Sequence, residues 1–549
     1  MDSMVVLLWT IMTYAVGALA AVRPHIIIIV ADDLGWNDVS FHGSNQIPTP
    51  NIDDLAYSGV ILNNYYVSPI CTPTRGALMS GRHPIHLGLQ SHVIVGSEPY
   101  GLPLNITIMP EWLKGLGYKA HMVGKWHLGF FKKEYTPTYR GFDTHVGYYE
   151  ACGDYYDHTY EASEDAFGYD FRRNGFLDYT AIGQYSTELF TVEANNIIRN
   201  HNSSEPLFLY LPFQAVHSGN LPDGKPLQAP KKYIDRFQHI ENKKRRVYAG
   251  MVAALDDAVG SIVGTLKSTG VYQNSVILFT TDNGGAANGY DGNAANNFPL
   301  RGCKETLWEG GLRGVGFINS PLLRTQSYVA DQMIHVCDWL PTLYRAAGGN
   351  PKSMTDLDGF DLWDMISTNG KNVRTEMLHN IDPTYPKSAL RVGDFKLLNG
   401  KISKKWGGWY PPWQHQGEDL NPYIYDGNTK QYEMLTYSNL TSKNKPSNKE
   451  PVVLQCGPKP ANASDNCHPD VKPCLYNISL DPCEYNNIAD KYPDIVKRLM
   501  DRLAEYNATM VPPGNKPQDP AASKKFHRMF GISLTCQQWR SDHVNLISG

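Results

Sequence analysis

The chain combines uninterrupted apolar runs with segments in which apolar residues recur at helical spacing. Residues 25–31 read His-Ile-Ile-Ile-Ile-Val-Ala, and similar runs occupy residues 207–213 and 276–281. A run of β-branched residues without polar alternation predicts a strand buried on both faces, as in a parallel sheet covered by helices. Helical spacing occurs between these runs, at residues 108–116, 188–200 and 246–267. Strands that alternate with helices indicate an α/β sandwich.

The pattern changes near residue 386. Residues 390–398 alternate and turn like an antiparallel hairpin, loops rich in Trp, Pro, Gly and Asn follow, and residues 493–506 are spaced as one amphipathic helix. A chain of 549 residues is too long for one ordinary core. We therefore expect a large domain at residues 21–385 and a smaller α+β domain with an antiparallel sheet at residues 386–549.

Residues 1–20 have the composition of a secretory signal peptide. An apolar stretch ends in Ala18-Leu19-Ala20, although no positive charge precedes it. A membrane anchor is the alternative, but the apolar run is short for a span of ~20 residues, and no later segment is expected to cross a bilayer. Six Asn-x-Ser/Thr sequons behind such a signal fit a glycosylated secretory protein. They begin at Asn105, Asn202, Asn439, Asn462, Asn477 and Asn507.

Charge and composition are those of an ordinary globular protein. Hydrophobic residues make up 42% and charged residues 19% of the chain, and the net charge is -4. A small negative net charge gives no reason to expect nucleic acid as a partner, and the short basic runs fit solvated surface. The sequence does not indicate an oligomeric state.

Nine cysteines are present, and four of them, Cys456, Cys467, Cys474 and Cys483, lie in one loop-rich segment. We expect disulfides there, because the spacing contains no Cys-x-x-Cys pair that would favour zinc. An odd total in an oxidising compartment leaves one thiol unpaired, and Cys71 is the expected one.

The most specific motif begins at Cys71 and reads Cys-Thr-Pro-Thr-Arg-Gly-Ala-Leu-Met-Ser-Gly-Arg to Arg82. It resembles the signature of the sulfatase family, in which the cysteine of Cys-x-Pro-x-Arg is oxidised to formylglycine in the endoplasmic reticulum. The resemblance implies a formylglycine-generating enzyme as a partner during maturation. The alternative is a structural cysteine in a proline turn, which the downstream Leu-Met-Ser-Gly-Arg disfavours.

Formylglycine explains why a cysteine would be modified. A hydrated aldehyde is a geminal diol, with one oxygen to attack sulfur and a second to expel the sulfate afterwards. A coordinated metal lowers the pKa of the attacking hydroxyl. A thiol has no second oxygen and is a poor ligand for a hard cation.

Acidic residues follow two of the predicted strands. Asp32-Asp33 ends the first apolar run, and Asp282-Asn283 ends the run at 276–281. Sites in parallel sheets form at the carboxyl ends of strands, so these oxygens can converge. Three carboxylates and one amide oxygen suit calcium or magnesium. Each pair alone would fit a turn or cap, but together with Cys71 they match the metal-binding positions of sulfatases.

Four further residues acquire roles only through the resemblance. Lys125 and His127 lie in Gly-Lys-Trp-His-Leu-Gly, where positions i and i+2 of an extended segment share a face. The resemblance implies that Lys125 contacts the sulfate and that His127 hydrogen-bonds the formylglycine hydroxyl. His217 and Lys304 would face the sulfate and the leaving oxygen. At a lysosomal pH near 5, ordinary histidines with a pKa of ~6.5 would be largely protonated.

Arg75 is expected to hold the hydrated formylglycine and its turn rather than the substrate. From His25 to about Tyr506 the chain resembles the arylsulfatase B branch of the family. This implies an alkaline-phosphatase-like core with a large, mostly parallel mixed sheet between helices, one calcium ion, and a C-terminal domain built on a small antiparallel sheet.

The substrate is the least determined point. The branch implies N-acetylgalactosamine 4-sulfate of chondroitin or dermatan sulfate, in a lysosomal or extracellular protein. The chain departs from the branch at residues 218–225, which are inserted, and at residues 152–173, both near the expected pocket mouth. A small-molecule sulfatase, such as an insect glucosinolate sulfatase, is therefore an alternative. A phosphohydrolase of the same superfamily or a non-catalytic glycan-binding relative is disfavoured by Cys71 and the intact motifs.

Overall fold

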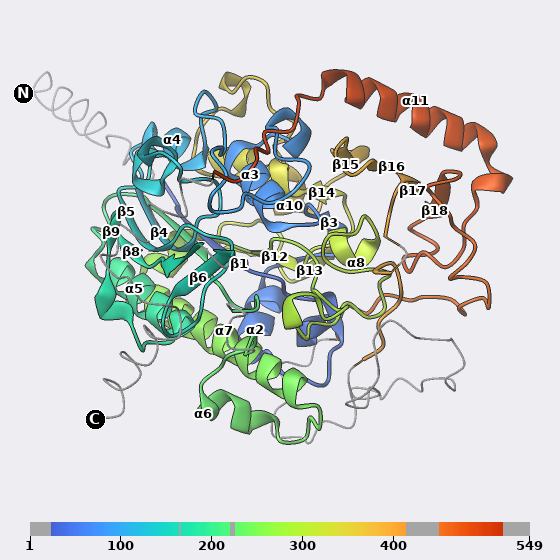
Figure 1. Ribbon diagram of the computed structural model, residues 1–549. Helices are drawn as coiled ribbons and strands as arrows, with labels where there is room; N and C mark the ends of the chain where they lie inside the picture. Colours follow the sequence, from blue (N-terminus) through green and yellow to red (C-terminus); the bar gives the residue numbers. More distant parts are fainter. Residues whose placement is uncertain (1–22, 164–165, 220–224, 404, 413–449, 520–549) are drawn as a thin grey trace, which may run out of the picture.

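The computed structural model describes residues 23–163, 166–219, 225–403, 405–412 and 450–519. The predicted signal peptide at residues 1–20 and the sequon at Asn439 lie outside these ranges. The described chain folds around one large sheet, with a smaller sheet beside it (Figure 1).

The large sheet has ten strands in the order β13-β2-β12-β11-β1-β10-β4-β5-β8-β9. Its five central strands, β11 to β5, run parallel, and antiparallel neighbours flank them. The sheet is therefore mixed but mostly parallel at its centre, as predicted. The strands are β1 (His25–Ala31), β2 (Val60–Leu62), β4 (Lys119–Lys125), β5 (Thr144–Tyr148), β8 (Arg172–Arg173), β9 (Phe176–Leu177), β10 (Leu207–Pro212), β11 (Ser275–Thr281), β12 (Gly316–Asn319) and β13 (Tyr328–Ala330).

Helices cover both faces of this sheet (Figure 1). Strand β1 shows why its sequence has no polar alternation: Ile27 and Ile29 belong to one core cluster, and Ile26 and Ile28 belong to the other. The first cluster includes residues of α2 (Pro50–Ser58), α5 (Ser186–Asn200) and α7 (Lys243–Ser268). The second includes residues of α3 (Cys71–Ser80), α4 (Met109–Lys114), α9 (Trp339–Ala346) and α10 (Trp363–Thr368).

The second sheet has four antiparallel strands in the order β15-β16-β17-β18. They are β15 (Glu376–Asp382), β16 (Lys387–Val392), β17 (Phe395–Gly400) and β18 (Cys474–Asn477). The hairpin predicted at residues 390–398 is β16-β17. Helix α11 (Pro493–Thr509) buries Leu499 and Leu503 against this sheet, at the upper right in Figure 1. One strand of the sheet, β15, precedes residue 386.

The remaining elements are short. Strands β3 (Tyr65–Tyr66) and β14 (Ile334–His335) pair in parallel, and β6 (Thr159–Ser163) and β7 (Ala166–Tyr169) form a hairpin. The short helices are α6 (Lys231–Ile234) and α8 (Glu309–Leu312). Helix α7 is long and apolar enough to cross a membrane, but 78% of its most apolar window is buried within the fold, so it is a core helix.

Disulfides join Cys456 to Cys483 and Cys467 to Cys474, which confirms the predicted cross-linked segment. The expectation that Cys71 alone is spared is wrong. Cys152, Cys303 and Cys337 are also unpaired within the described residues, because each lies in a different part of the core or pocket. Of the described sequons, Asn105, Asn202, Asn462 and Asn507 are exposed, whereas Asn477 is half-buried at the end of β18.

A buried ion cluster lies where the C-terminal sheet packs against the large domain. The ammonium of Lys396 on β17 lies 2.8 Å from a carboxylate oxygen of Glu309 and 2.9 Å from one of Glu484, and all three side chains are inaccessible. The Tyr66 hydroxyl donates to Glu309 at 2.7 Å. Through these pairs, buried charges link β17 of the C-terminal sheet to Glu309 at the start of α8 in the large domain.

Candidate active site

The acidic residues of the site come from adjacent strand ends. Strands β1 and β11 are paired in parallel up to Ala31 and Thr281, so the two following loops meet. The Asp33 amide donates to Asp282 Oδ1 at 3.3 Å, and Asn283 Nδ2 donates to Asp33 Oδ1 at 2.7 Å. All four predicted oxygen donors are buried together. A Cβ at Gly284 would lie 1.8 Å from the Gly310 carbonyl oxygen, so only glycine permits this loop to pack so closely.

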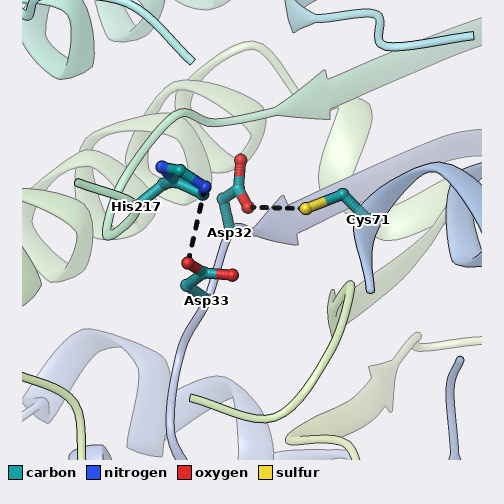
Figure 2. Close-up of side chains that lie close together, drawn as sticks. All are labelled: Asp32, Asp33, Cys71 and His217. Atoms are coloured by element: carbon teal, nitrogen blue, oxygen red, sulfur yellow. Dashed lines mark hydrogen bonds and ion pairs between the residues drawn. The ribbon is translucent and has the colours of Figure 1, made fainter. Parts of the chain in front are cut away.

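Cys71 is the first residue of α3, and the helix brings it to the acidic cluster. Its Sγ lies 3.8 Å from Asp32 Oδ1, as Figure 2 shows. Burial and the neighbouring Asp282 carboxylate raise the pKa of the thiol well above its ordinary value. An unmodified Cys71 would therefore stay neutral and be a weak nucleophile, because the thiolate is the reactive form.

Two buried cations, Arg75 and Lys125, pair with the carboxylates of Asp32 and Asp282. Arg75, one turn along α3, donates from both Nε and Nη2 to one oxygen, Asp282 Oδ2, at 3.1 and 2.8 Å, and its Nη2 lies 3.4 Å from Asp32. The Lys125 ammonium lies 2.6 Å from Asp32 Oδ2. Arg75 also donates to the carbonyl of Lys125 at 3.2 Å. Arg75 thus holds the carboxylates and the end of β4 in place, as a residue that supports the site.

His127 reaches the site differently from the way the sequence predicted. Strand β4 ends at Lys125, and His127 adopts a left-handed backbone with φ of 56°. Strand alternation therefore does not explain why both residues meet the site; a turn after the strand does. His127 Nε2 contacts the Ile94 carbonyl at 3.0 Å, and its buried Nδ1 has no partner within the described chain. Burial, followed by Lys125, lowers the pKa of His127 well below its ordinary value.

Lys304 contacts both Asp33 and His217. The Lys304 ammonium lies 2.8 Å from Asp33 Oδ2 and 3.0 Å from His217 Nε2. The Nδ1 atom of His217 lies 2.7 Å from the Ser218 carbonyl, so it is the nitrogen that carries the proton. Burial and the Lys304 ammonium lower the pKa of His217 to about 4. The pKa values of both histidines are thus lowered, in contrast to the expectation of ordinary histidines that are largely protonated at pH 5.

A cavity of about 440 Å³ opens above these groups. Cys71, His127, His217 and Lys304 line it, whereas Lys125 is completely buried beneath. The two divergent segments contribute to its wall, as expected. Sequence reasoning placed the segment of Cys152, Tyr160 and Glu161 near the pocket mouth but gave these residues no role. It missed His92, Tyr290 and Asp291, which lie in segments without a motif.

The oxygen donors fit a hard divalent cation. Ligand atoms of Asp32, Asp33, Cys71 and His217 all lie within 4.8 Å of one another (Figure 2). Asn283 Oδ1 is buried without a hydrogen-bond partner among the described residues. A buried acceptor left without a donor is costly, and a bound cation would satisfy it.

Carboxylates at two strand ends, residue 71 at the start of α3 and buried cations thus gather at one edge of the sheet, next to the cavity. The family model described as Sulfatase matches residues 24–349, and the chain belongs to this family. It is 39% identical to Arylsulfatase J of Mus musculus, across 93% of this chain and 80% of that protein. It is 30% identical to N-acetylgalactosamine-6-sulfatase of Mus musculus, across 63% of this chain and 68% of that protein.

Solved structures show the same architecture. The crystal structure of Ps i-CgsB superposes with a TM-score of 0.69 at 26% identity, and the match covers 93% of this chain and 98% of that one. The fold is therefore the alkaline-phosphatase-like sulfatase fold with a small C-terminal antiparallel sheet. The protein is a sulfuric ester hydrolase.

Proposed function

We propose that this sulfatase acts through a formylglycine made from Cys71, beside one calcium ion held by Asp32, Asp33, Asp282 and Asn283. The observation that supports this most directly is the position of Cys71 Sγ, 3.8 Å from Asp32 Oδ1 at the edge of the buried oxygen cluster. A hydrated aldehyde at this position would supply one oxygen for attack and a second for release of sulfate.

The charges of the chain's own side chains are balanced at this site. Asp32, Asp33 and Asp282 supply three carboxylates, and Arg75, Lys125 and Lys304 supply three cations. A divalent cation held by the oxygens adds positive charge that attracts the sulfate and lowers the pKa of a hydroxyl beside it. The balanced framework thus becomes an anion site when the cation binds.

The surrounding residues divide the remaining tasks. Lys304 lines the cavity and carries protons at Nζ, so it is placed to neutralise or protonate the departing oxygen. Neutral His217 accepts from Lys304 and orients it. His127, with its free Nδ1 lining the same cavity, is placed to exchange a hydrogen bond with a hydroxyl on residue 71. Lys125 positions Asp32 from beneath.

An O-sulfated sugar is the proposed substrate, with N-acetylgalactosamine 4-sulfate as the first candidate. The sulfatase relatives support a glycan sulfate, and the sequence motifs support the arylsulfatase B branch, although the comparisons do not single out that branch. A small-molecule sulfatase of the glucosinolate type is the second candidate, because divergent residues such as Tyr160, Glu161 and Gly219 line the cavity. The proposed location is the secretory pathway, either lysosomal or extracellular.

The mass of the peptide that contains residue 71 tests the proposal. Conversion of CH₂SH to CHO lowers this mass by ~18 Da in protein purified from a eukaryotic secretory host. The same preparation should release sulfate from 4-nitrophenyl sulfate, and a Cys71→Ala variant should not. A thiol-bearing peptide in active enzyme would show that the formylglycine assignment is wrong.

A further inference from the structure

Two carboxylates line the candidate active-site cavity at its more exposed end. Glu161 lies on β6, and Asp291 lies in the short turn that follows Gly289. Both side chains are half-buried, whereas the proposed catalytic residues of the same lining are buried. Glu161 and Asp291 are therefore nearer the solvent, and we call them the mouth carboxylates.

The charge of the mouth carboxylates is not neutralised within the described chain, where neither side chain forms an ion pair or a hydrogen bond. Lys304 is the one lysine or arginine among the described lining residues, and its ammonium lies 2.8 Å from Asp33. Although burial acts to lower the pKa of Lys304, Asp33 and then Asp291 are among the groups that raise it. The negative charge at the mouth thus acts across the cavity.

The backbone holds Asp291 in place. Its φ of 53° lies in the left-handed region, which aspartate and asparagine adopt more readily than other non-glycine residues. The Asn293 amide donates to the Tyr290 carbonyl at 3.0 Å and closes the turn. A Cβ at Gly292 would lie 2.5 Å from Pro226 Cγ, so the turn packs closely against the neighbouring segment. Asp291→Asn should therefore keep the turn and remove only the charge.

The buried end of the cavity has a different character. His127 is 2% exposed and lines the cavity, and its Nδ1 has no hydrogen-bond partner within the described chain. A buried polar atom of this kind is normally satisfied, so it indicates that a ligand group reaches this end. The proposed function places the sulfate here, beside residue 71 and Lys304. The rest of the substrate then extends toward the mouth carboxylates.

A sulfate monoester with an uncharged alcohol part is complementary to this arrangement. Its negative charge is confined to the sulfate, at the buried end. Ionised carboxylates accept hydrogen bonds and donate none, so the hydroxyl groups of the alcohol part can donate to Glu161 and Asp291. A second anionic group beside the ester would instead meet two like charges, and unpaired like charges are a common means of rejecting the wrong ligand.

We propose that Glu161 and Asp291 determine specificity, by accepting hydroxyl groups of an uncharged alcohol part and repelling substrates that carry a second anionic group beside the sulfate ester. The inference rests on the proposed function, because it takes the sulfate to lie at the buried end of the cavity. It makes a sugar with a single sulfate the preferred substrate over a polyanionic sugar.

The test compares two substrates that share the reacting group, N-acetylgalactosamine 4-sulfate and N-acetylgalactosamine 4,6-disulfate. Loss of the 4-sulfate is followed by chromatography of the sugar product. The wild-type kcat/KM should be about tenfold higher for the monosulfate, the size expected for two partly screened like-charge contacts. Asp291→Asn and Glu161→Gln should each reduce this ratio about threefold, and the double variant should bring it close to one.

Salt provides a second readout that a purely structural role would not move. Raising the ionic strength from about 0.05 to about 0.5 M shortens the screening length, so the wild-type ratio should fall toward that of the double variant. The ratio in the double variant should change little, because the charges that salt would screen are absent. A ratio is internal to each variant, so a partial loss of folded enzyme cancels.

Asp356→Asn is the matched control. Asp356 also has a left-handed backbone, with φ of 57°, but it is exposed, lies 3.6 Å from Arg82 and does not line the cavity. This variant should leave the ratio unchanged. A wild-type ratio in both mouth variants would overturn the inference while the proposed function stands. No sulfate release from either sugar, despite turnover of 4-nitrophenyl sulfate, would overturn the glycan substrate and the inference with it.

Discussion

The ammonium of Lys125 lies 2.6 Å from the carboxylate of Asp32, and both side chains are completely inaccessible. Asp282 adds a second carboxylate nearby, and burial together with Asp32 raises its pKa. The Lys125 ammonium is thus a counter-ion of Asp32 before any metal cation binds. It also lies near Cys71, the proposed catalytic residue. Its two roles can be separated by experiment.

Lys125→Met should lower the free energy of unfolding by about 3 kcal/mol, because it leaves a buried carboxylate without one of its partners. Calcium should restore part of this loss, since a cation among the same oxygens replaces the missing charge. Thermal unfolding with and without 1 mM calcium measures both effects. An equal loss in the two conditions would show that the cation does not bind near Asp32.

Asn283→Leu should weaken cation binding while preserving side-chain volume. The variant removes Oδ1, the buried acceptor that has no donor among the described residues. We expect the calcium concentration that restores half of the activity after chelation to rise about tenfold or more, the effect of one lost oxygen contact. The control is Asn350→Leu, at an exposed position. Asn296 is unsuitable, because its side-chain amide makes hydrogen bonds to neighbouring loops. A similar shift in both variants would contradict the ligand assignment.

His217→Gln should lower kcat for sulfate release about 100-fold, within the usual range for a lost acid–base or orienting group. The substitution removes the imidazole ring, whose Nε2 lies 3.0 Å from the Lys304 ammonium, and puts in its place an amide that cannot exchange a proton near neutral pH. Because the proposed role concerns the leaving oxygen, the loss should be smaller for 4-nitrophenyl sulfate, whose phenolate leaves easily, than for a sugar sulfate. Steady-state kinetics on both substrates provide the measurement. Equal losses would place His217 in sulfate binding instead.

Much of the scaffold follows from local sequence. The strands at β1, β10 and β11 were predictable because apolar runs that lack polar alternation are typical of a sheet buried on both faces. The carboxyl ends of β1 and β11 then place Asp32 and Asp282 at one edge of the sheet. The C-terminal hairpin was also predictable, but a boundary at residue 386 leaves β15 (Glu376–Asp382) in the preceding domain, and its pairing with β16 is a contact that the local pattern does not signal.

Side-chain positions in loops were less predictable. His127 meets the site through a left-handed turn, which its sequence context does not signal. The low pKa of His217 depends on burial and on Lys304, a residue 87 positions away in sequence. Cys303 and Cys337 are spared from disulfides because the fold buries them apart, and spacing along the chain cannot show this.

Acid should destabilise the protein through its buried histidines. Burial lowers the pKa of His83 to about 4, although Asp358 nearby acts to raise it. Between pH 6.5 and 4 the unfolded state binds a proton that the folded state does not, so stability falls as the pH falls. At pH 5 this contributes about 2 kcal/mol for one such group.

The stability difference between wild type and His83→Gln should therefore be about 2 kcal/mol smaller at pH 5 than at pH 7.5. The comparison with the variant cancels the pH-dependent contribution of the other buried histidines, such as His42 and His145, whose pKa values are also lowered. Urea unfolding at the two pH values is the measurement. A constant difference would mean that His83 is protonated equally in both states.

The ion cluster at Lys396 joins the C-terminal sheet to the large domain. Lys396→Met leaves Glu309 and Glu484 buried without their shared counter-ion, and we expect a loss of about 3 kcal/mol at pH 8. Burial raises the pKa of Glu484 to about 7 even with Lys396 present, so this carboxyl takes up a proton readily. The loss should therefore be smaller at pH 5.

Lys497→Met on α11 provides the matched control, because Lys497 forms an exposed ion pair with Asp501 and its removal should change stability little at either pH. Urea unfolding followed at pH 5 and pH 8 distinguishes the two positions. Equal destabilisation by Lys396→Met at both pH values would show that Glu484 does not neutralise itself by protonation. In that case the groups that neutralise the carboxylates would be Arg313 and Arg391, which also act on Glu309.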